Sequence, residues 1–217
     1  MGIQFNSNDA KAFRATLEKY YNAKHAIADL MNKKADTIKA YNALIASNDD
    51  DLSAIESGEY KGKKTKQSIA TENASLREKI EDAKSDYTDA KAEQDKRVEK
   101  ALPLYTKDMH KGAQKAIATF GNDMSEWRKA LSAMLVANGL KDATPANVAR
   151  FDFLVVVRTN NAKKVYKDNT LVGVGSEKQS ANVFLSALAE YLVTEKVISP
   201  FKHKYVPMSE RNKKDKK

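Results

Sequence analysis

Two stretches of the sequence carry the same hydrophobic spacing, and they constrain the fold more than any other feature. Residues 8–46 and 66–104 are equal in length and are joined by 19 residues. In each, the residues that would face a partner helix recur at alternating steps of four and three, the heptad period of a coiled coil. They are Phe13, Leu17, Tyr20, Lys24, Ile27, Met31, Lys34, Ile38, Tyr41 and Ile45, then Ile69, Asn73, Leu76, Ile80, Ala83, Tyr87, Ala90, Gln94, Arg97, Ala101 and Leu104. The spacing predicts one long antiparallel helical hairpin with arms of roughly 58 Å.

The two sets of contact residues also suggest how the helices align. Placing Ile45 beside Ile69 brings Met31 opposite Ala83, so that a large side chain faces a small one, as close packing requires. Polar residues interrupt the contact line, which weakens a two-helix core but helps to specify one alignment. Further apolar residues lie beside that line and favour packing by a third helix, a second copy or another protein: Tyr21, Leu30, Leu44 and Val98.

The rest of the chain reads as a smaller domain. The run 47–51 predicts a helix stop, because Ser, Asn and Asp side chains compete for the backbone, and residues 47–66 are expected to form a basic tip loop. Pro103 is expected to end or kink the second long helix, because it lacks a backbone N–H. We expect a small α+β domain over 105–200, with helices over 105–120, 126–138 and from Ser176 or Ser180 to Val197. The predicted inner faces of the last two helices are Trp127, Leu131, Met134 and Leu135, and Val183, Phe184, Leu188, Tyr191 and Leu192. Phe151–Arg158 predicts a strand, and Lys164–Tyr166 is expected to pair back on it after a turn at Asn160–Asn161, which makes a short β-hairpin. Thr170–Val174 predicts another strand. The fold class is therefore mainly α: a helical hairpin (1–104), an α+β head (105–200) and a basic tail (201–217).

Charge is distributed unevenly along the chain. Up to Leu104, 18 Lys and Arg balance 18 Asp and Glu, whereas from Tyr105 onward 20 face 11, which gives the whole net charge of +9. A basic half favours an acidic partner, either nucleic acid or a protein surface, although surface lysines can also serve solubility alone. The absence of cysteine excludes disulfides and thiolate chemistry.

The residues that could bind such a partner lie in the tip loop and the tail. Lysines with one aromatic side chain can contact a phosphate backbone or an acidic patch. These candidates are Tyr60, Lys61, Lys63, Lys64 and Lys66 in the loop, and Lys202, Lys204, Arg211, Lys213, Lys214, Lys216 and Lys217 in the tail. The glycines around Tyr60 have three residues between them where a phosphate-binding loop has four.

No arrangement of residues predicts catalysis, a metal site or a cofactor. His25 has a possible ligand one turn away in Asp29, but two ligands fall short of a zinc site, and 49–51 lacks the spacing of a calcium loop. The N-terminus lacks a secretory signal and no apolar run is long enough to span a bilayer, so we expect a cytoplasmic protein without a membrane partner, or one carried in a virion assembled there.

The preferred hypothesis is a non-enzymatic structural or assembly protein that forms homo-oligomers or binds a protein partner. A small Lys- and Asn-rich chain without cysteine would suit a viral protein, such as a bacteriophage virion or scaffold component. The alternative is a nucleic-acid-binding protein, or an inhibitor of a nucleic-acid-processing complex, that uses the basic tip and tail.

Overall fold

The computed structural model describes residues 7–119, 121–152 and 177–205. Contacts divide the chain into two units. One, here the core unit, comprises Met1–Ala23 and Asp95–Phe201; the other, the hairpin unit, comprises Lys24–Gln94 and Lys202–Lys217. The two longest helices contribute residues to both units, which are described separately below.

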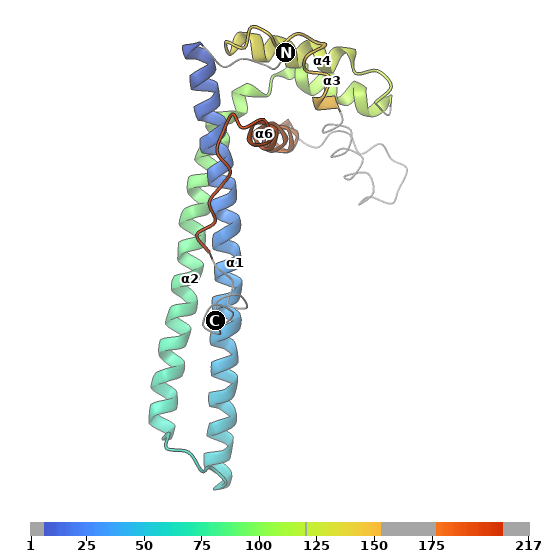
Figure 1. Cartoon of the computed structure of the whole chain (residues 1–217). Helices are drawn as coiled ribbons and strands as arrows, with labels where there is room; N and C mark the ends of the chain where they lie inside the picture. The colour runs from blue at the N-terminus through green and yellow to red at the C-terminus, as the bar shows by residue number, and fades with distance from the viewer. Residues whose placement is uncertain (1–6, 120, 153–176, 206–217) are drawn as a thin grey trace, which may run out of the picture. The chain divides into compact units, whose positions relative to one another are not determined.

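Two antiparallel helices form the hairpin unit (Figure 1). Helix α1 spans Asn8–Ser57 and α2 spans Lys66–Ala101, so the helical hairpin predicted from the heptad spacing is confirmed. Helix α1 continues through the predicted stop at 47–51 and ends where Gly58 adopts a φ of +77°. The prediction of a 47–66 loop was therefore wrong about its start, and only 58–65 lies between the helices.

Polar side chains in 47–53 form contacts that are compatible with a continuous helix. Asn48 is buried, and its Nδ2 donates a 2.8 Å hydrogen bond to Oδ1 of Asn73 in α2. The Ser53 hydroxyl donates to the carbonyl of Asp49 one turn earlier, at 3.0 Å. Asn and Ser side chains can end a helix when they hydrogen-bond the nearby backbone in a non-helical conformation. Here Asn48 bonds across the hairpin instead, and Ser53 bonds a carbonyl one turn earlier in the continuous helix.

The alignment of the two helices differs from the predicted one by a full heptad. Asn48 meets Asn73, and the Lys34 ammonium lies 4.7 Å from the centre of the Tyr87 ring, so paired residue numbers add up to 121. The predicted pairing of Ile45 with Ile69 adds up to 114. Because a heptad pattern repeats every seven residues, hydrophobic spacing alone cannot distinguish these alignments. The buried hydrogen bond between Asn48 and Asn73 distinguishes them.

Besides its parts of α1 and α2, the described part of the core unit contains three helices and a short 3₁₀ turn. They are η1 (Leu102–Leu104), α3 (Lys107–Ala118), α4 (Ser125–Ala137) and α6 (Glu177–Thr194). Pro103 lies in η1, directly after α2, as expected for a residue without a backbone N–H. The Thr106 hydroxyl caps α3 by accepting from the Met109 N–H.

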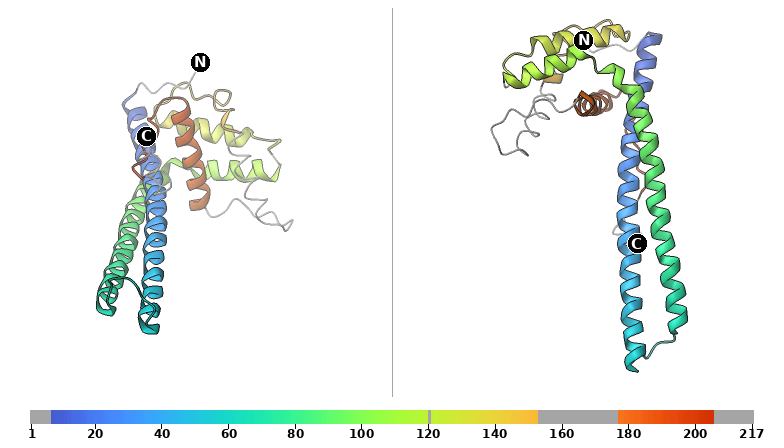
Figure 2. Two further views of the ribbon diagram at one scale, coloured as in Figure 1. Left: turned by 60° about the horizontal axis from the view of Figure 1, so that its bottom comes forward. Right: turned by 180° about the vertical axis from the view of Figure 1, so that it is seen from behind.

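Helices α3 and α4 pack closely side by side (Figure 2). A Cβ atom on Gly112 of α3 would lie 2.7 Å from the Cα of Trp127 in α4, so only glycine allows this approach. Trp127 is buried, and its ring meets that of Phe184 from α6 at 5.6 Å in a T-shaped arrangement. The predicted inner face of α4 (Trp127, Leu131, Met134 and Leu135) is confirmed.

The inner face of α6 was predicted less accurately. Phe184, Leu188 and Leu192 are buried as expected, whereas Val183 is 43% exposed. On the same helix, the Ser186 hydroxyl and the Asn182 carbonyl lie 3.0 and 3.1 Å from the hydroxyl of buried Tyr20. The first turns of α1 thus belong to the same core as α6.

The predicted β-hairpin falls mainly outside the described residues, which do not include 153–176 and therefore neither Lys164–Tyr166 nor the further strand Thr170–Val174. Phe151 and Asp152 are helical, so the predicted strand does not begin at Phe151. The Phe151 N–H donates to the carbonyl of Val148 at 3.0 Å and its ring is buried, while Asp152 forms an ion pair with Arg128 of α4. The described residues contain no strand.

Candidate interaction surface

The tip loop does not present its lysines as a free basic cluster. The Lys64 ammonium donates to Oδ1 of Asn48 at 2.6 Å and to Oε2 of Glu72 at 3.0 Å. The hydrogen bond to Glu72 is the main cause that raises the pKa of Lys64. Lys66 pairs with Glu56 at 3.1 Å. Two of the four predicted phosphate-binding lysines thus already have acidic partners within the hairpin.

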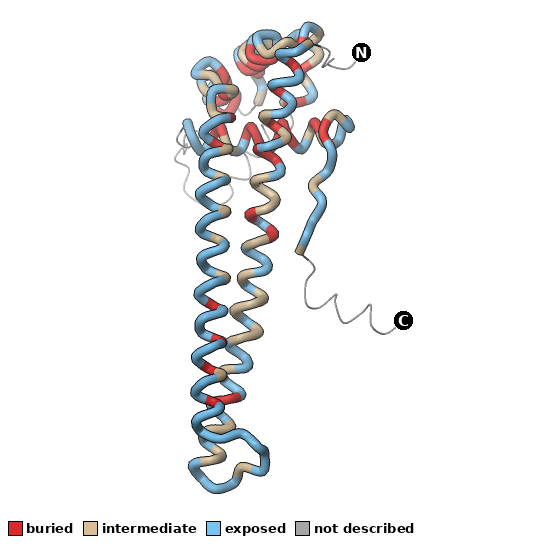
Figure 3. Tube along the Cα trace, turned by 90° about the vertical axis from the view of Figure 1, so that its left-hand side faces the viewer, coloured by how far each residue is buried: buried red, intermediate tan, exposed pale blue. Residues whose placement is uncertain are grey.

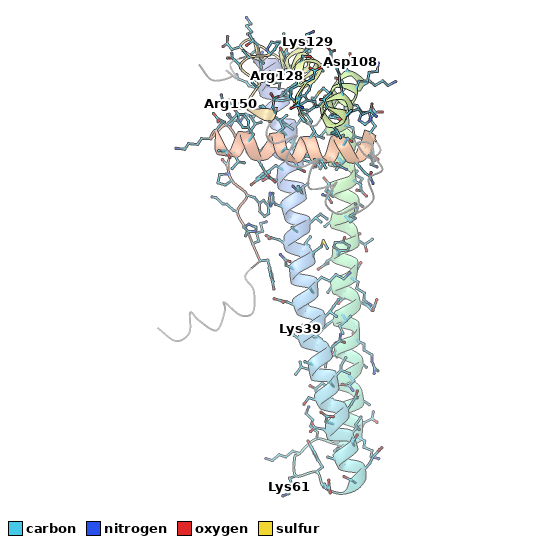
Figure 4. All side chains as sticks on the ribbon, turned by 90° about the vertical axis from the view of Figure 1, so that its right-hand side faces the viewer. Lys39, Lys61, Asp108, Arg128, Lys129 and Arg150 are labelled. Atoms are coloured by element: carbon cyan, nitrogen blue, oxygen red, sulfur yellow. The ribbon has the colours of Figure 1, made fainter. Side chains whose placement is uncertain are left out.

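Tyr60 supports the loop from within. Its hydroxyl accepts a 3.2 Å hydrogen bond from the Lys64 N–H, and a Cβ on Gly62 would lie 2.3 Å from that hydroxyl. Lys61 and Lys63 are exposed, and Lys61 extends from the end of the hairpin (Figure 4). Residues 48–73 contain six Asp and Glu against four Lys, so the region has a net negative charge.

Only the first part of the predicted tail lies within the described residues. Lys202 and Lys204 are exposed, while Arg211, Lys213, Lys214, Lys216 and Lys217 lie outside that part of the chain. Between the two lysines, Nδ1 of His203 lies 2.7 Å from Oδ1 of Asp29 in α1. Sequence reasoning noted the spacing of His25 and Asp29 but had no local signal for a partner 174 residues away.

Outside the tip, the middle of the hairpin has no buried residues (Figure 3). Burial in α1 extends through Ile27 and Asp29 and returns at Asn48, and in α2 it runs from Ile69 to Ile80. No residue of 30–47 or 81–94 is buried, although all of them are described. Met31 is 51% exposed and Leu44 is 48% exposed. We call 30–47 together with 81–94 the mid-hairpin surface.

Lysine side chains cover part of the tyrosines in this region. Lys34 of α1 lies over Tyr87 of α2, and Lys79 of α2 lies 5.9 Å from the ring centre of Tyr41 in α1. The apolar part of a lysine can shield an aromatic ring while its charge stays in water. These polar contact residues hold the two helices together without closing an apolar core.

The two arms of the hairpin differ in charge. Residues 24–47 of α1 contain four Lys and two Asp, a net charge of +2, and Lys39 extends from this arm (Figure 4). Residues 72–94 of α2 contain seven Asp and Glu against four Lys and Arg, a net charge of −3. Each arm is therefore complementary in charge to the opposite arm.

Nothing in the described part of the chain indicates a metal centre or a membrane span. No group of three or more His, Asp or Glu residues there is placed to hold a metal ion. None of the helices in that part is both long and apolar enough to cross a bilayer. No protein-family model matches the chain, and no match was found among curated proteins or solved structures.

Proposed function

We propose that the protein is a non-enzymatic assembly protein that acts through protein–protein contacts, with the mid-hairpin surface as its contact region. The observation that carries this proposal is the absence of any buried residue in 30–47 and 81–94, although heptad spacing continues through both segments. A coiled-coil pattern that leaves Met31 and Leu44 about half exposed is completed when further helices pack against it.

The free energy available from such packing is modest for each side chain but adds up across an interface. Complete burial of a Leu or Met side chain contributes about 1.5–3 kcal/mol, so covering the exposed half contributes roughly 1 kcal/mol per side chain. Met31 and Leu44 from two copies would together contribute about 4 kcal/mol, before the half-buried Leu30, Ile38 and Tyr41 are considered.

The partner we propose is a second copy of the chain. A symmetric dimer uses the same surface on both copies. With a two-fold axis parallel to the helices, α1 of one copy lies against α2 of the other, so the arm of charge +2 faces the arm of charge −3 on both sides. The product is a four-helix bundle in which each mid-hairpin surface covers the other.

Size-exclusion chromatography with light scattering tests this function. The wild-type chain should show twice the 24.2 kDa chain mass, with the dimer fraction rising with concentration. The double variant Met31→Gln/Leu44→Gln should weaken dimerisation at least about tenfold, the equivalent of 1.4 kcal/mol. Val136→Gln is the matched control, because Val136 is 50% exposed but lies in the core unit.

A monomer at every concentration that also binds no protein from its native source would overturn the proposal. Nucleic-acid binding that weakens steeply with salt, in a chain that does not self-associate, would favour the alternative hypothesis instead. The pairing of Lys64 and Lys66 with Glu72 and Glu56 argues against the tip as the origin of such binding.

A further inference from the structure

Asp29 is a buried carboxylate on α1 whose two oxygens are both engaged by a segment from the other end of the chain. Its side chain is 11% exposed. Oδ1 lies 2.7 Å from Nδ1 of His203, and Oδ2 accepts a 3.1 Å hydrogen bond from the backbone N–H of Lys204. Both partners lie in the extended segment 202–205, which runs along α1 in the hairpin unit (Figure 1).

A second histidine completes the environment of the His203 ring. His25 lies one helical turn before Asp29, and its ring meets that of His203 edge-on, with centres 6.3 Å apart and planes at 89°. The titratable and charged groups near His203 include His25 and Asp29 from α1, and Lys202 and Lys204 from its own segment. Asp29 is the acid that contacts the His203 ring.

These contacts stabilise the charged form of the Asp29 carboxylate. Burial alone would raise the pKa of Asp29, but the hydrogen bonds from His203 and Lys204 and the positive charges of His203 and His25 together outweigh burial and lower it. A buried carboxylate without partners is costly, whereas one that accepts two hydrogen bonds beside cationic groups is stable. The attachment of the segment and the ionisation of Asp29 therefore support each other.

We propose that Asp29 and His203 form a pH-sensitive latch that fixes residues 202–205 along α1. Asp29 and His203 lie outside the mid-hairpin surface (30–47 and 81–94). Both bonds of the latch end on the Asp29 carboxylate, so both respond to the ionisation of that group.

The sign of the pH effect follows from the ionisation of Asp29. A carboxylate whose pKa is lowered in the closed state stabilises that state above its ordinary pKa of 3.8, and this stabilisation is lost as the pH falls through the lowered value. Acid therefore opens the latch.

Hydrogen exchange of the Lys204 amide, followed by NMR in the full-length chain, tests the latch because this N–H donates directly to Asp29. At neutral pH the wild-type amide should be protected. Asp29→Asn, which keeps the side-chain shape, should reduce the protection factor at least about tenfold, which is 1.4 kcal/mol of local opening. Lys202→Gln, in the same segment, is the matched control and should leave protection unchanged.

His203→Asn provides a second variant that leaves α1 intact, so its effect cannot come from damage to the helix. It keeps a hydrogen-bond donor near the position of Nδ1 but carries no charge, and it should also increase Lys204 exchange. Equal, unprotected exchange of the Lys204 amide in the wild type and in both variants would overturn the proposal. So would Lys204 protection in the wild type that does not decrease as the pH is lowered into the acid range, while Trp127 fluorescence reports an intact core unit.

Discussion

The core unit and the hairpin unit are both helical, but they bury their apolar residues very differently. In the core unit, Trp127, Leu131 and Leu188 are each at most 1% exposed and come from different helices or different turns of one helix. In the hairpin unit, burial stops in the middle of both helices, where Met31 and Leu44 remain about half exposed. The core unit buries its apolar side chains within itself, whereas the hairpin unit leaves apolar side chains exposed in the middle of its helices.

The difference shows how the number of packed helices governs burial. A residue of α4 can be covered from several sides by α3, α6 and the first turns of α1, whereas a residue in the middle of a two-helix hairpin has one neighbouring helix and solvent on its flanks. The same heptad spacing therefore produces a closed core where additional helices pack and a half-open surface where they do not. The proposed dimer supplies the missing helices.

The largest expected difference in unfolding free energy comes from replacing a leucine by alanine in each of the two units. Leu131→Ala should lower the free energy of unfolding by about 3–4 kcal/mol, because Leu131 is fully buried and its removal leaves a cavity. Leu44→Ala, measured in dilute solution where the chain is monomeric, should cost less than about 1 kcal/mol because that side chain already contacts water. Urea unfolding followed by circular dichroism, with the single tryptophan Trp127 reporting on the core unit, measures both. Similar losses of unfolding free energy in the two variants would show that the two units do not differ in packing.

The alignment of the hairpin should depend on its buried asparagine pair. In a chain without native cysteine, Ile38→Cys/Ala83→Cys should form an intrachain disulfide, since these numbers add up to 121, whereas Met31→Cys/Ala83→Cys should not. Asn73→Ala alone should cost about 1–3 kcal/mol, because it leaves the buried Asn48 amide without its partner. Replacing both asparagines by leucine should allow the second disulfide to form as well. Its formation in the otherwise native chain would mean that the observed alignment is wrong.

These results indicate which parts of the fold local sequence could specify. The hairpin, the helix termini around Pro103 and the buried face of α4 follow from periodicity and backbone chemistry, and all three are confirmed. The alignment of the hairpin and the continuation of α1 to Ser57 depend on Asn48 finding Asn73, a tertiary contact that heptad spacing does not encode. In the same way, no local pattern links Asp29 to His203, and the sequence could not show that Lys64 and Lys66 are paired with acids.

The ionisation of Tyr105 should make the stability of the core unit depend on pH. Burial, reinforced by the charge of Glu177 and opposed by a hydrogen bond with Ser180, raises the pKa of Tyr105 to about 12. The folded state thus favours the neutral phenol, so stability should fall as the pH rises from about 10 towards 12, by at most about 2 kcal/mol. Tyr105→Phe should remove this part of the pH dependence, as measured by urea unfolding at pH 9 and pH 11. An equally steep decrease in the variant would assign the effect to other residues.

The smallest effect is expected at the hairpin tip. Lys66→Gln removes an ion pair with Glu56 in which both side chains are more than half exposed, so the change in unfolding free energy should be about 0–0.5 kcal/mol. Thermal unfolding at low and high salt measures it. A larger loss would show that the tip, rather than the asparagine pair, holds the end of the hairpin together.

Disulfide trapping between two differently labelled copies tests the central claim most directly. One copy carries Leu44→Cys in α1 and the other carries Lys79→Cys in α2, two positions at similar heights on opposite arms of the hairpin. The proposed dimer predicts that the mixed pair cross-links rapidly under mild oxidation, while Leu44→Cys alone does not cross-link to itself, because the two-fold axis places the α1 helices diagonally. No mixed product, or self-linked Leu44→Cys in equal yield, would contradict the proposed packing of α1 against α2 of the second copy.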